Sequence, residues 1–313
     1  MNKKLTKELC NLIKGEIRFN ELLSKHTSFR IGGHADVWIY PKDISDIKNT
    51  LMFCNSYNIP VTILGGGTNV LISDKGIRGV VLNLEHGLCD IKIKGERITC
   101  GTGALLSKLL KQSARKELTG LEFTAGIPGT VGGAVSMNAG TKKNQKSKIK
   151  NQNLEYMGIG DLVESVKVID MNGNISELGK NDLSFGYRKS NLYEYIIVEA
   201  ELKLKRGKEK EINDRISRLL EHKKSTQVLD IPSAGCIFKN PDIHSSGRLI
   251  DKAGLKGLVI GDAQISEKHA NFIVNNGNAK AQDVLELIKK IKLTVFEKTG
   301  VKLEEEIKVI GMQ

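Results

Sequence analysis

Two glycine-rich segments constrain this chain more than any other feature. Gly65-Gly66-Gly67-Thr68-Asn69 follows a short apolar run at 61–64, and residues 126–140 have the sequence GIPGTVGGAVSMNAG. Glycine accounts for 32 of the 313 residues, about a tenth of the chain against a usual ~7%, whereas proline accounts for only 5, so the composition is not that of a flexible linker. We therefore expect the glycines at sharp turns and where the backbone approaches a ligand closely.

The first glycine segment predicts a phosphate-binding loop. Consecutive glycines allow several backbone N–H groups to point at one anion, because no Cβ blocks its approach. The dinucleotide fingerprint G-x-G-x-x-G does not fit, since Val70 stands at its last glycine position and residues 70–73 have the pattern of a strand. The P-loop does not fit either, because no G-K-[ST] occurs. Together the two segments suggest one dinucleotide-sized ligand held at two points, and glycines that serve only packing are the alternative.

The hydrophobic pattern alternates between strands and helices. A strand at 35–40 precedes a helix with Ile44, Ile47 and Leu51 on one face, and a buried strand at 61–64 follows. Further strands are expected at 80–84, 91–93, 98–100, 163–170 and 196–205, and further helices at 104–115, 212–222 and 281–298. A change in composition at 206–210 (RGKEK) marks a linker. We therefore expect an α+β fold with a bipartite first domain, 1–82 and 83–205, and a smaller α/β domain at 206–313.

The chain is basic, with 48 lysines and arginines against 36 acidic side chains and a formal net charge of +12. Such a balance suits nucleic acid or acidic small molecules such as phosphates. The charge is spread, except that residues 141–153 carry five lysines and no acid. This stretch is expected to be an exposed loop that chemistry does not require. No nucleic-acid-binding motif accompanies it, so we expect small phosphorylated ligands and no nucleic acid.

Several classes of protein are excluded by simpler features. No run approaches the ~18 apolar residues of a membrane span, and the first residues lack the apolar stretch of a signal peptide. The five cysteines include no C-x-x-C pair, which argues against structural zinc and a disulfide framework. We therefore expect a cytoplasmic protein without a metal or a membrane partner, and a monomer.

Further motifs occur in a fixed order along almost the whole chain. They are HTSFRIGGHAD at 26–36, FGYRKS at 185–190, GCIFKNP at 235–241, SGRLIDKAGLKG at 246–257, SEKHANFIVN at 266–275 and LEEEIKVIG at 303–311. With the two glycine segments, they resemble the UDP-N-acetylenolpyruvoylglucosamine reductases, flavoproteins of peptidoglycan precursor synthesis. GIPGTVGGAV also fits the wider superfamily of flavin oxidases that resemble vanillyl-alcohol oxidase, which implies a bipartite FAD-binding domain of that type.

The resemblance implies a two-step reaction. NADPH reduces FAD, and the flavin then reduces the enolpyruvyl ether of UDP-N-acetylglucosamine to UDP-N-acetylmuramate. By resemblance, Arg188 and Glu306 stabilise the negative charge that develops beside the substrate carboxylate, which suits an arginine and a carboxyl group with a raised pKa. Cys236 stands where many family members have the proton-donating serine. A structural role is the alternative for each of these residues: a surface ion pair for Arg188, a small buried apolar group for Cys236 and a solvated face for Glu306.

The resemblance also implies the binding residues. The substrate diphosphate is expected at Tyr187, Lys224 and Asn240, where Lys224 lies twelve positions before Cys236 as in the family. FAD is expected along the two glycine loops, at Gly65, Gly66, Gly67, Thr68, Asn69, Thr124, Ala125, Gly126, Ile127, Gly129, Gly132 and Gly133.

Besides Cys236, the chain departs from the family pattern at a second place. After Asn138-Ala139-Gly140 the family continues with a short Ala-Tyr-Gly-type turn, but here the lysine-rich insertion intervenes, so no contact from that turn is carried over. Between Gly254 and Asn275 there is no room for the tyrosine-bearing loop of the longer family members, which indicates the shorter type. Two other functions remain open: another FAD-dependent oxidoreductase of the superfamily, and a non-catalytic basic binding protein on this scaffold.

Overall fold

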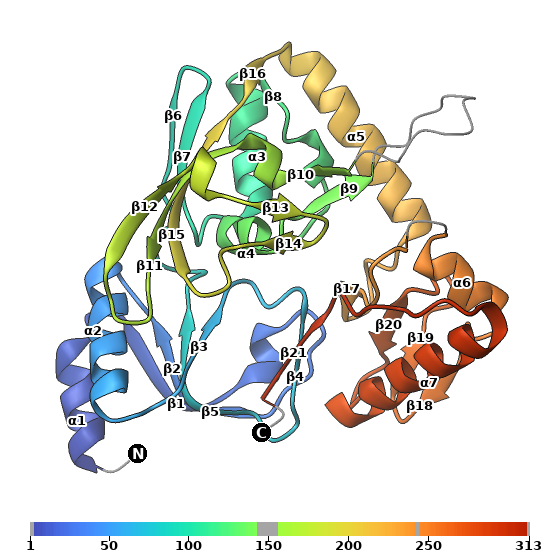
Figure 1. The fold of residues 1–313 in the computed structure, drawn as a ribbon, viewed down its shortest axis with the longest axis horizontal. Coiled ribbons are helices and arrows are strands. Elements are labelled where there is room, and N and C mark those ends of the chain that lie inside the picture. Colours follow the sequence, from blue (N-terminus) through green and yellow to red (C-terminus); the bar gives the residue numbers. More distant parts are fainter. Residues whose placement is uncertain (1–2, 143–155, 242–243, 312–313) are drawn as a thin grey trace.

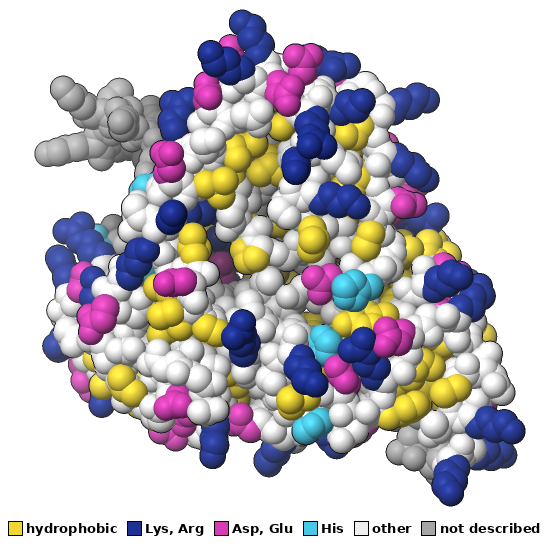
Figure 2. Space-filling model, turned by 180° about the vertical axis from the view of Figure 1, so that it is seen from behind, with side chains coloured by type: hydrophobic (Ala, Val, Ile, Leu, Met, Phe, Trp, Pro, Cys, Tyr) yellow, Lys and Arg dark blue, Asp and Glu magenta, His cyan; other side chains and the backbone are white. Residues whose placement is uncertain are grey.

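Separate hydrophobic cores organise the chain into three lobes (Figure 1). The structure is a computed structural model and describes residues 3–142, 156–241 and 244–311. The greater part of the lysine-rich insertion, residues 143–155, therefore lies outside the described residues. Lysine and arginine side chains are scattered over the face in Figure 2 and do not gather in one patch.

The first lobe contains a four-stranded sheet, and two helices pack together at its side (Figure 1). Asp43 caps the second helix by accepting a hydrogen bond from the backbone N–H of Asp46 at 3.1 Å, and the predicted residues Ile47 and Leu51 are buried. This confirms the helix and the two neighbouring strands that the hydrophobic pattern predicts. The sheet has the order β1 (Glu16–Leu22), β2 (His34–Tyr40), β5 (Ile77–Asn83) and β3 (Val61–Leu64), and the helices are α1 (Lys3–Leu12) and α2 (Ile44–Ser56).

The second lobe is a five-stranded antiparallel sheet packed against two helices. Its strand order is β12 (Ile175–Gly179), β11 (Val163–Ile169), β15 (Ile196–Lys203), β7 (Arg97–Gly101) and β6 (Ile91–Lys94), and its helices are α3 (Leu106–Arg115) and α4 (Val131–Ser136). Two small hairpins reach toward the third lobe, β9 (Gly140–Lys142) with β10 (Tyr156–Gly158), and β13 (Phe185–Gly186) with β14 (Lys189–Ser190). A short ladder pairs β8 (Leu118–Thr119) with β16 (Lys205–Arg206).

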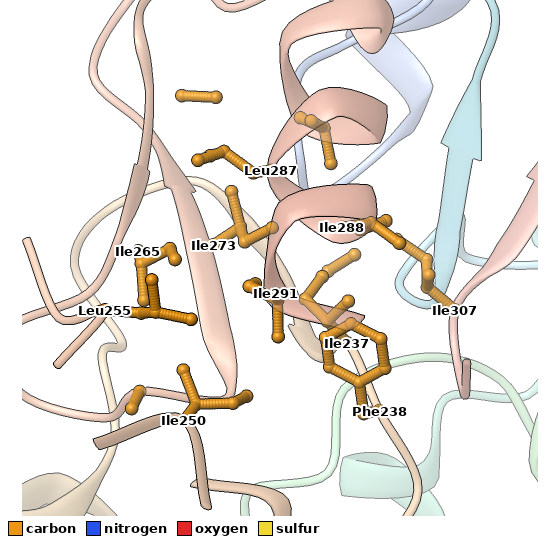
Figure 3. Packing of buried hydrophobic residues seen from close by; sticks show 14 of the residues in the cluster. Ile237, Phe238, Ile250, Leu255, Ile265, Ile273, Leu287, Ile288, Ile291 and Ile307 are labelled. Atoms are coloured by element: carbon orange, nitrogen blue, oxygen red, sulfur yellow. The ribbon is translucent and has the colours of Figure 1, made fainter. Parts of the chain in front are cut away.

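The third lobe packs a long helix, α7 (Ala281–Thr299), on a four-stranded sheet. Ile288 and Ile291 of this helix are buried, and Figure 3 shows them among side chains of the sheet and the adjoining segments. Gly300 ends the helix in the left-handed conformation at φ +69°, as glycine commonly does. The other elements of this lobe are β17 (Ser233–Cys236), α6 (Ser246–Lys252), β18 (Val259–Ile260), β19 (Ala263–Ile265) and β20 (Phe272–Asn275). Helix α5 (Glu209–Thr226) leads into the lobe and packs against α3 of the second lobe.

The end of the chain returns to the first lobe. Strand β21 (Lys308–Ile310) pairs in parallel with β4 (Val70–Ile72), directly after the first glycine segment (Figure 1). The carboxylate of Asp74 accepts hydrogen bonds from the first two backbone N–H groups of α7, Ala281 at 2.9 Å and Gln282 at 3.2 Å. These contacts place residues 303–307 beside the glycine loop. Among the described residues, no helix combines the length and the apolar composition that crossing a membrane requires.

In the described ranges, four single-turn 3₁₀ helices accompany these elements. They are η1 (Leu23–His26), η2 (Glu122–Thr124), η3 (Ile159–Leu162) and η4 (Lys180–Asp182). Of these, η2 leads directly into the second glycine segment, which therefore begins on a buried turn.

Candidate active site

A cavity of about 1220 Å³ lies where the three lobes meet. Its lining combines both glycine loops with Arg188 from the second lobe and with Cys236 and Glu306 from the third. The three residues expected to carry the chemistry are 48 and 70 positions apart in the sequence, and the fold brings them to one cavity. This is the arrangement that a reaction between a bound cofactor and a substrate requires.

The two glycine loops face one another across part of the cavity. A Cβ built on Gly66 would lie 3.1 Å from the Cα of Gly129, and one built on Gly65 would lie 2.8 Å from Thr130 Oγ1. Gly67 has φ +60° and Gly129 has φ +107°, which only glycine adopts readily. Side chains at these positions would collide with neighbouring atoms of the protein, so the two loops pack backbone to backbone and form a cradle that suits the diphosphate of FAD.

Nine of the twelve residues expected to bind FAD line this cavity: Gly65, Gly66, Gly67, Thr68, Asn69, Gly126, Ile127, Gly129 and Gly133. Gly132 lines a second cavity of about 380 Å³, which shares Gly65, Thr130 and Gly133 with the first. Thr124 and Ala125 line neither cavity. They are buried behind the loop, where Thr124 Oγ1 donates a hydrogen bond to the carbonyl of Leu121 at 2.7 Å.

Arg188 and Glu306 form an ion pair at the cavity wall. Arg188 occupies the turn of the β13–β14 hairpin with φ +55°, an uncommon conformation for a residue with a side chain. Its Nε donates to Glu306 Oε1 at 2.5 Å, and the two side chains are only 19% and 12% exposed. Burial raises the pKa of Glu306 even though Arg188 opposes the shift, as the sequence analysis anticipated.

The backbone around Glu306 is held by its own lobe and by the first lobe. The Glu306 N–H donates to the carbonyl of Ile237 at 2.8 Å, next to Cys236. From the glycine loop, Asn69 Nδ2 donates to the carbonyl of Glu306 at 3.1 Å, and the carbonyl of Asn69 accepts from the N–H of Lys308 at 3.0 Å. Asn69 therefore connects the cofactor loop to the carboxyl group expected to act on the substrate.

Cys236 ends strand β17, opposite Phe272 of β20. It follows Gly235, whose φ of +75° lies within the register shift of β17 against β20 between Ser233 and Cys236. Burial raises the pKa of the Cys236 thiol to about 12, and the nearby carboxyl of Glu306 contributes in the same direction. The thiol is therefore protonated at neutral pH and can act as a proton donor.

Of the three residues expected at the substrate diphosphate, the structure brings two to the cavity. Tyr187 and Asn240 line it, and the hydroxyl of Tyr187 accepts a hydrogen bond from the backbone N–H of Asn240 at 3.2 Å. Lys224 is exposed and does not line the cavity, whereas Lys223 does. The side chain of Lys223 lies against Gly126, and burial lowers its pKa to about 8. Successive residues of a helix point about 100° apart, so only one of two adjacent lysines can face the cavity.

Sequence reasoning missed Tyr156, which lies immediately after the insertion. Strands β9 and β10 pair across the insertion, and Tyr156 Oη accepts a hydrogen bond from Arg188 Nη1 at 2.9 Å. The sequence did contain an indication of this residue. Tyr156 and Gly158 follow the insertion in the same order as the tyrosine and the glycine of the family's Ala-Tyr-Gly-type turn. The length of the intervening segment concealed their proximity to Arg188.

Comparisons with known protein families define the class. A model of an FAD binding domain matches residues 35–179, and a model of the C-terminal domain of UDP-N-acetylenolpyruvoylglucosamine reductase matches residues 226–310. The chain is thus a flavoprotein with an FAD-binding domain and a separate C-terminal domain.

Full-length relatives identify the family. The chain is 43% identical to the UDP-N-acetylenolpyruvoylglucosamine reductase of Clostridioides difficile, with 97% of this chain and 96% of the relative covered. It is also 43% identical to that of Caldanaerobacter subterraneus, with 98% of each covered. The crystal structure of the reductase from Thermus caldophilus superimposes with a TM-score of 0.77 at 37% identity, and the match covers 95% of this chain and 99% of that one. The chain belongs to the UDP-N-acetylenolpyruvoylglucosamine reductase family, which confirms the resemblance.

Proposed function

We propose that this protein reduces the enolpyruvyl ether of UDP-N-acetylglucosamine to UDP-N-acetylmuramate with FAD and NADPH, a step of peptidoglycan precursor synthesis. The observation that carries the proposal is the cavity in which Arg188, Glu306 and Cys236 meet beside two glycine loops. Family membership supports the substrate, and the FAD binding domain supports the cofactor.

The glycine loops are proposed to hold FAD. Backbone N–H groups at 65–69 and 126–133 would meet its diphosphate, and the absence of side chains at Gly66 and Gly129 allows the two loops to approach each other closely enough to hold it together. When bound, FAD supplies a carrier that accepts hydride from NADPH and delivers it to the substrate. The rest of the reaction depends on side chains of this chain.

Arg188 and Glu306 are proposed to stabilise the charge that develops on the substrate. Within the described part of the chain, Arg188 Nη2 makes no hydrogen bond, so it can donate to the substrate carboxylate. The raised pKa of Glu306 favours its protonated form, which can donate a second hydrogen bond there. Both groups are largely buried. Hydrogen bonds to a developing charge are stronger in such a site than in water.

Cys236 is proposed as the proton donor. After the methylene carbon has been reduced, the neighbouring carbon, next to the carboxylate, needs a proton, and the Cys236 thiol would give its Sγ proton to that carbon. A pKa of about 12 keeps the thiol protonated at neutral pH, yet it remains a stronger acid than water at ~15.7.

For the substrate diphosphate we propose Tyr187, Asn240 and Lys223, with Lys223 in place of Lys224. Lys223 lies between Gly126 of the cofactor loop and the cavity, and its ammonium group can meet a phosphate there. The partners are therefore small phosphorylated molecules.

We also propose that the protein acts as a cytoplasmic monomer divided into FAD-binding units at 1–82 and 83–205 and a substrate unit at 206–313. The nucleotide substrate and the NADPH reductant support the cytoplasm. Three main hydrophobic clusters, each formed mostly by residues of one unit, support the division, although residues such as Ile169 and Leu71 join the cluster of another unit and β21 of the last unit pairs with β4 of the first.

An anaerobic flavin assay tests the function. NADPH is expected to bleach the flavin absorbance, and only the enolpyruvyl UDP-sugar is expected to restore it. Restoration by another acceptor alone would favour a different oxidoreductase of the superfamily. Protein without flavin after reconstitution with FAD would favour the non-catalytic binding function.

A further inference from the structure

We infer that Tyr156 is a positioning residue that orients Arg188 for the reduction. This inference rests on the proposed function and concerns a residue supplied by the strand that follows the lysine-rich insertion. Tyr156 contacts Arg188 and has no need to touch the substrate itself.

The hydroxyl of Tyr156 lies between two partners. It accepts a hydrogen bond from Arg188 Nη1 at 2.9 Å and donates one to the backbone carbonyl of Asn138. Burial raises the pKa of Tyr156 to about 12, so the hydroxyl stays neutral and fills both roles throughout the neutral range. One proton and one lone pair thus fix the position of the oxygen beside the guanidinium group.

The ring of Tyr156 adds a second constraint. It stands edge-to-face on Tyr187 with the ring centroids 5.1 Å apart, a favourable geometry for aromatic pairs. Arg188 Cζ lies 5.7 Å from the centroid of Tyr156 and 5.5 Å from that of Tyr187, within the range of cation–π attraction. The two tyrosines therefore enclose the guanidinium group from two sides.

The remaining contacts of Arg188 show what this arrangement achieves. Nε binds Glu306, and Nη1 binds both Tyr156 and the carbonyl of Gly140, the latter at 2.9 Å. Because a guanidinium group is planar, contacts at Nε and Nη1 also determine the direction of Nη2. Nη2 is the nitrogen proposed to meet the substrate carboxylate, so Tyr156 determines where that donor points.

The site of Tyr156 is itself built by Asn138. Asn138 is buried with φ +45°, its Nδ2 donates to the carbonyl of Gly186 at 2.8 Å, and its Oδ1 accepts from the N–H of Gly160 at 2.9 Å. These bonds connect the β9–β10 hairpin to the β13–β14 hairpin, whose turn holds Arg188. The strained backbone of Arg188 is thus supported by a second hairpin, as an unfavourable φ requires.

The substitution Tyr156→Phe removes the hydroxyl and keeps the ring. In the flavin-loaded enzyme we expect NADPH to reduce the flavin within about twofold of the parent rate, and reoxidation by the enolpyruvyl substrate to slow about ten- to hundredfold, as for loss of a hydrogen bond to a charged group. Tyr57→Phe is the matched control, because its hydroxyl bonds Glu8 Oε2 at 2.9 Å on the surface, and it should leave both rates unchanged.

A binding measurement separates this role from a general loss of structure. By calorimetry, UDP-N-acetylmuramate should bind Tyr156→Phe about tenfold more weakly, whereas UDP-N-acetylglucosamine, which has no carboxylate for Arg188, should bind as it does to the parent. In an Arg188→Ala background, Tyr156→Phe should change reoxidation by less than about twofold, because coupled residues are not additive.

The inference is overturned if Tyr156→Phe reoxidises its flavin and binds UDP-N-acetylmuramate as the parent does. It is also overturned if the variant loses flavin or binds both nucleotides more weakly, since either result assigns Tyr156 a structural role. Failure of the parent enzyme to react with the enolpyruvyl substrate would instead refute the proposed function.

Discussion

Replacement of Cys236 by alanine tests the proposed proton donor, a thiol at a position where many family members have serine. If the thiol donates the proton, Cys236→Ala should block reoxidation of the reduced flavin by the enolpyruvyl substrate. Reduction of the flavin by NADPH should continue, because that half-reaction needs no proton from Cys236. Cys236→Ser restores an O–H donor and should retain much of the activity.

The structure allows the two roles of Cys236 to be separated by magnitude. Its side chain packs beside Val228, Phe272 and Val274, so alanine removes the contacts of one sulfur atom, comparable to a methylene group at ~0.8 kcal/mol. Such a loss lowers the melting temperature of a chain of 313 residues by only about 1 °C, because the entropy of unfolding is about 2.1 cal/mol/K per residue. A general acid contributes about 10²- to 10⁴-fold, or roughly 3–5 kcal/mol of activation free energy. The catalytic effect therefore exceeds the packing effect several times over.

Stopped-flow absorbance of the flavin measures the two half-reactions separately. The pKa of Cys236, which burial raises to about 12, means that the donor keeps its proton until the pH approaches that value. With saturating substrate, the parent rate of reoxidation should therefore show no loss attributable to Cys236 up to about pH 10. An alanine variant that reoxidises at the parent rate and forms product would refute the donor assignment. Equal defects in the alanine and serine variants would indicate packing alone.

Three further substitutions test the neighbouring groups. Burial raises the pKa of Glu306, so the folded protein loses stability as the pH rises above the usual pKa of a carboxyl group. The melting temperature of Glu306→Gln should therefore exceed that of the parent by more at pH 8 than at pH 4.5. Burial lowers the pKa of Lys223 to about 8, so the affinity of the parent for UDP-N-acetylmuramate, measured by calorimetry, should fall as the pH rises through that value. Lys223→Gln should bind weakly at every pH, and Lys224→Gln should behave as the parent. Asn69→Ala removes the 3.1 Å bond to the Glu306 carbonyl and should slow reoxidation by the substrate about fivefold, roughly 1 kcal/mol, in stopped-flow measurements; an unchanged rate would show that the bond does not position Glu306.

Local patterns allowed much of the fold and the site to be predicted. Helix α2 follows from its apolar spacing, and the turn at 65–69 follows from three glycines after a buried strand. Such features depend on neighbours within a few residues, so the sequence contains them directly. Arg188, Cys236 and Glu306 were predicted through the family resemblance, because each lies in a short motif of fixed order.

Features that depend on distant contacts were not predictable in the same way. The pairing of β21 with β4 joins segments more than 230 residues apart, and no local pattern encodes it. Lys223 and Lys224 are indistinguishable until the rotation of helix α5 against the cavity is known. Tyr156 was concealed because the insertion separates it from β9, its partner in the hairpin.

The free hydrogen-bonding capacity of Arg188 explains how the cavity can bind an anion without losing its own ion pair. Removing one partner from a buried pair typically costs about 3–5 kcal/mol, because a charge is left without compensation. A substrate carboxylate that displaced Glu306 would therefore bind against a substantial penalty. The geometry avoids this, since Glu306 occupies Nε while Nη2 makes no hydrogen bond to the described residues. The carboxylate can be added to the pair without breaking the contact at Nε, and the burial that raises the pKa of Glu306 eases its protonation when a second acidic group approaches, which limits the repulsion between the two groups.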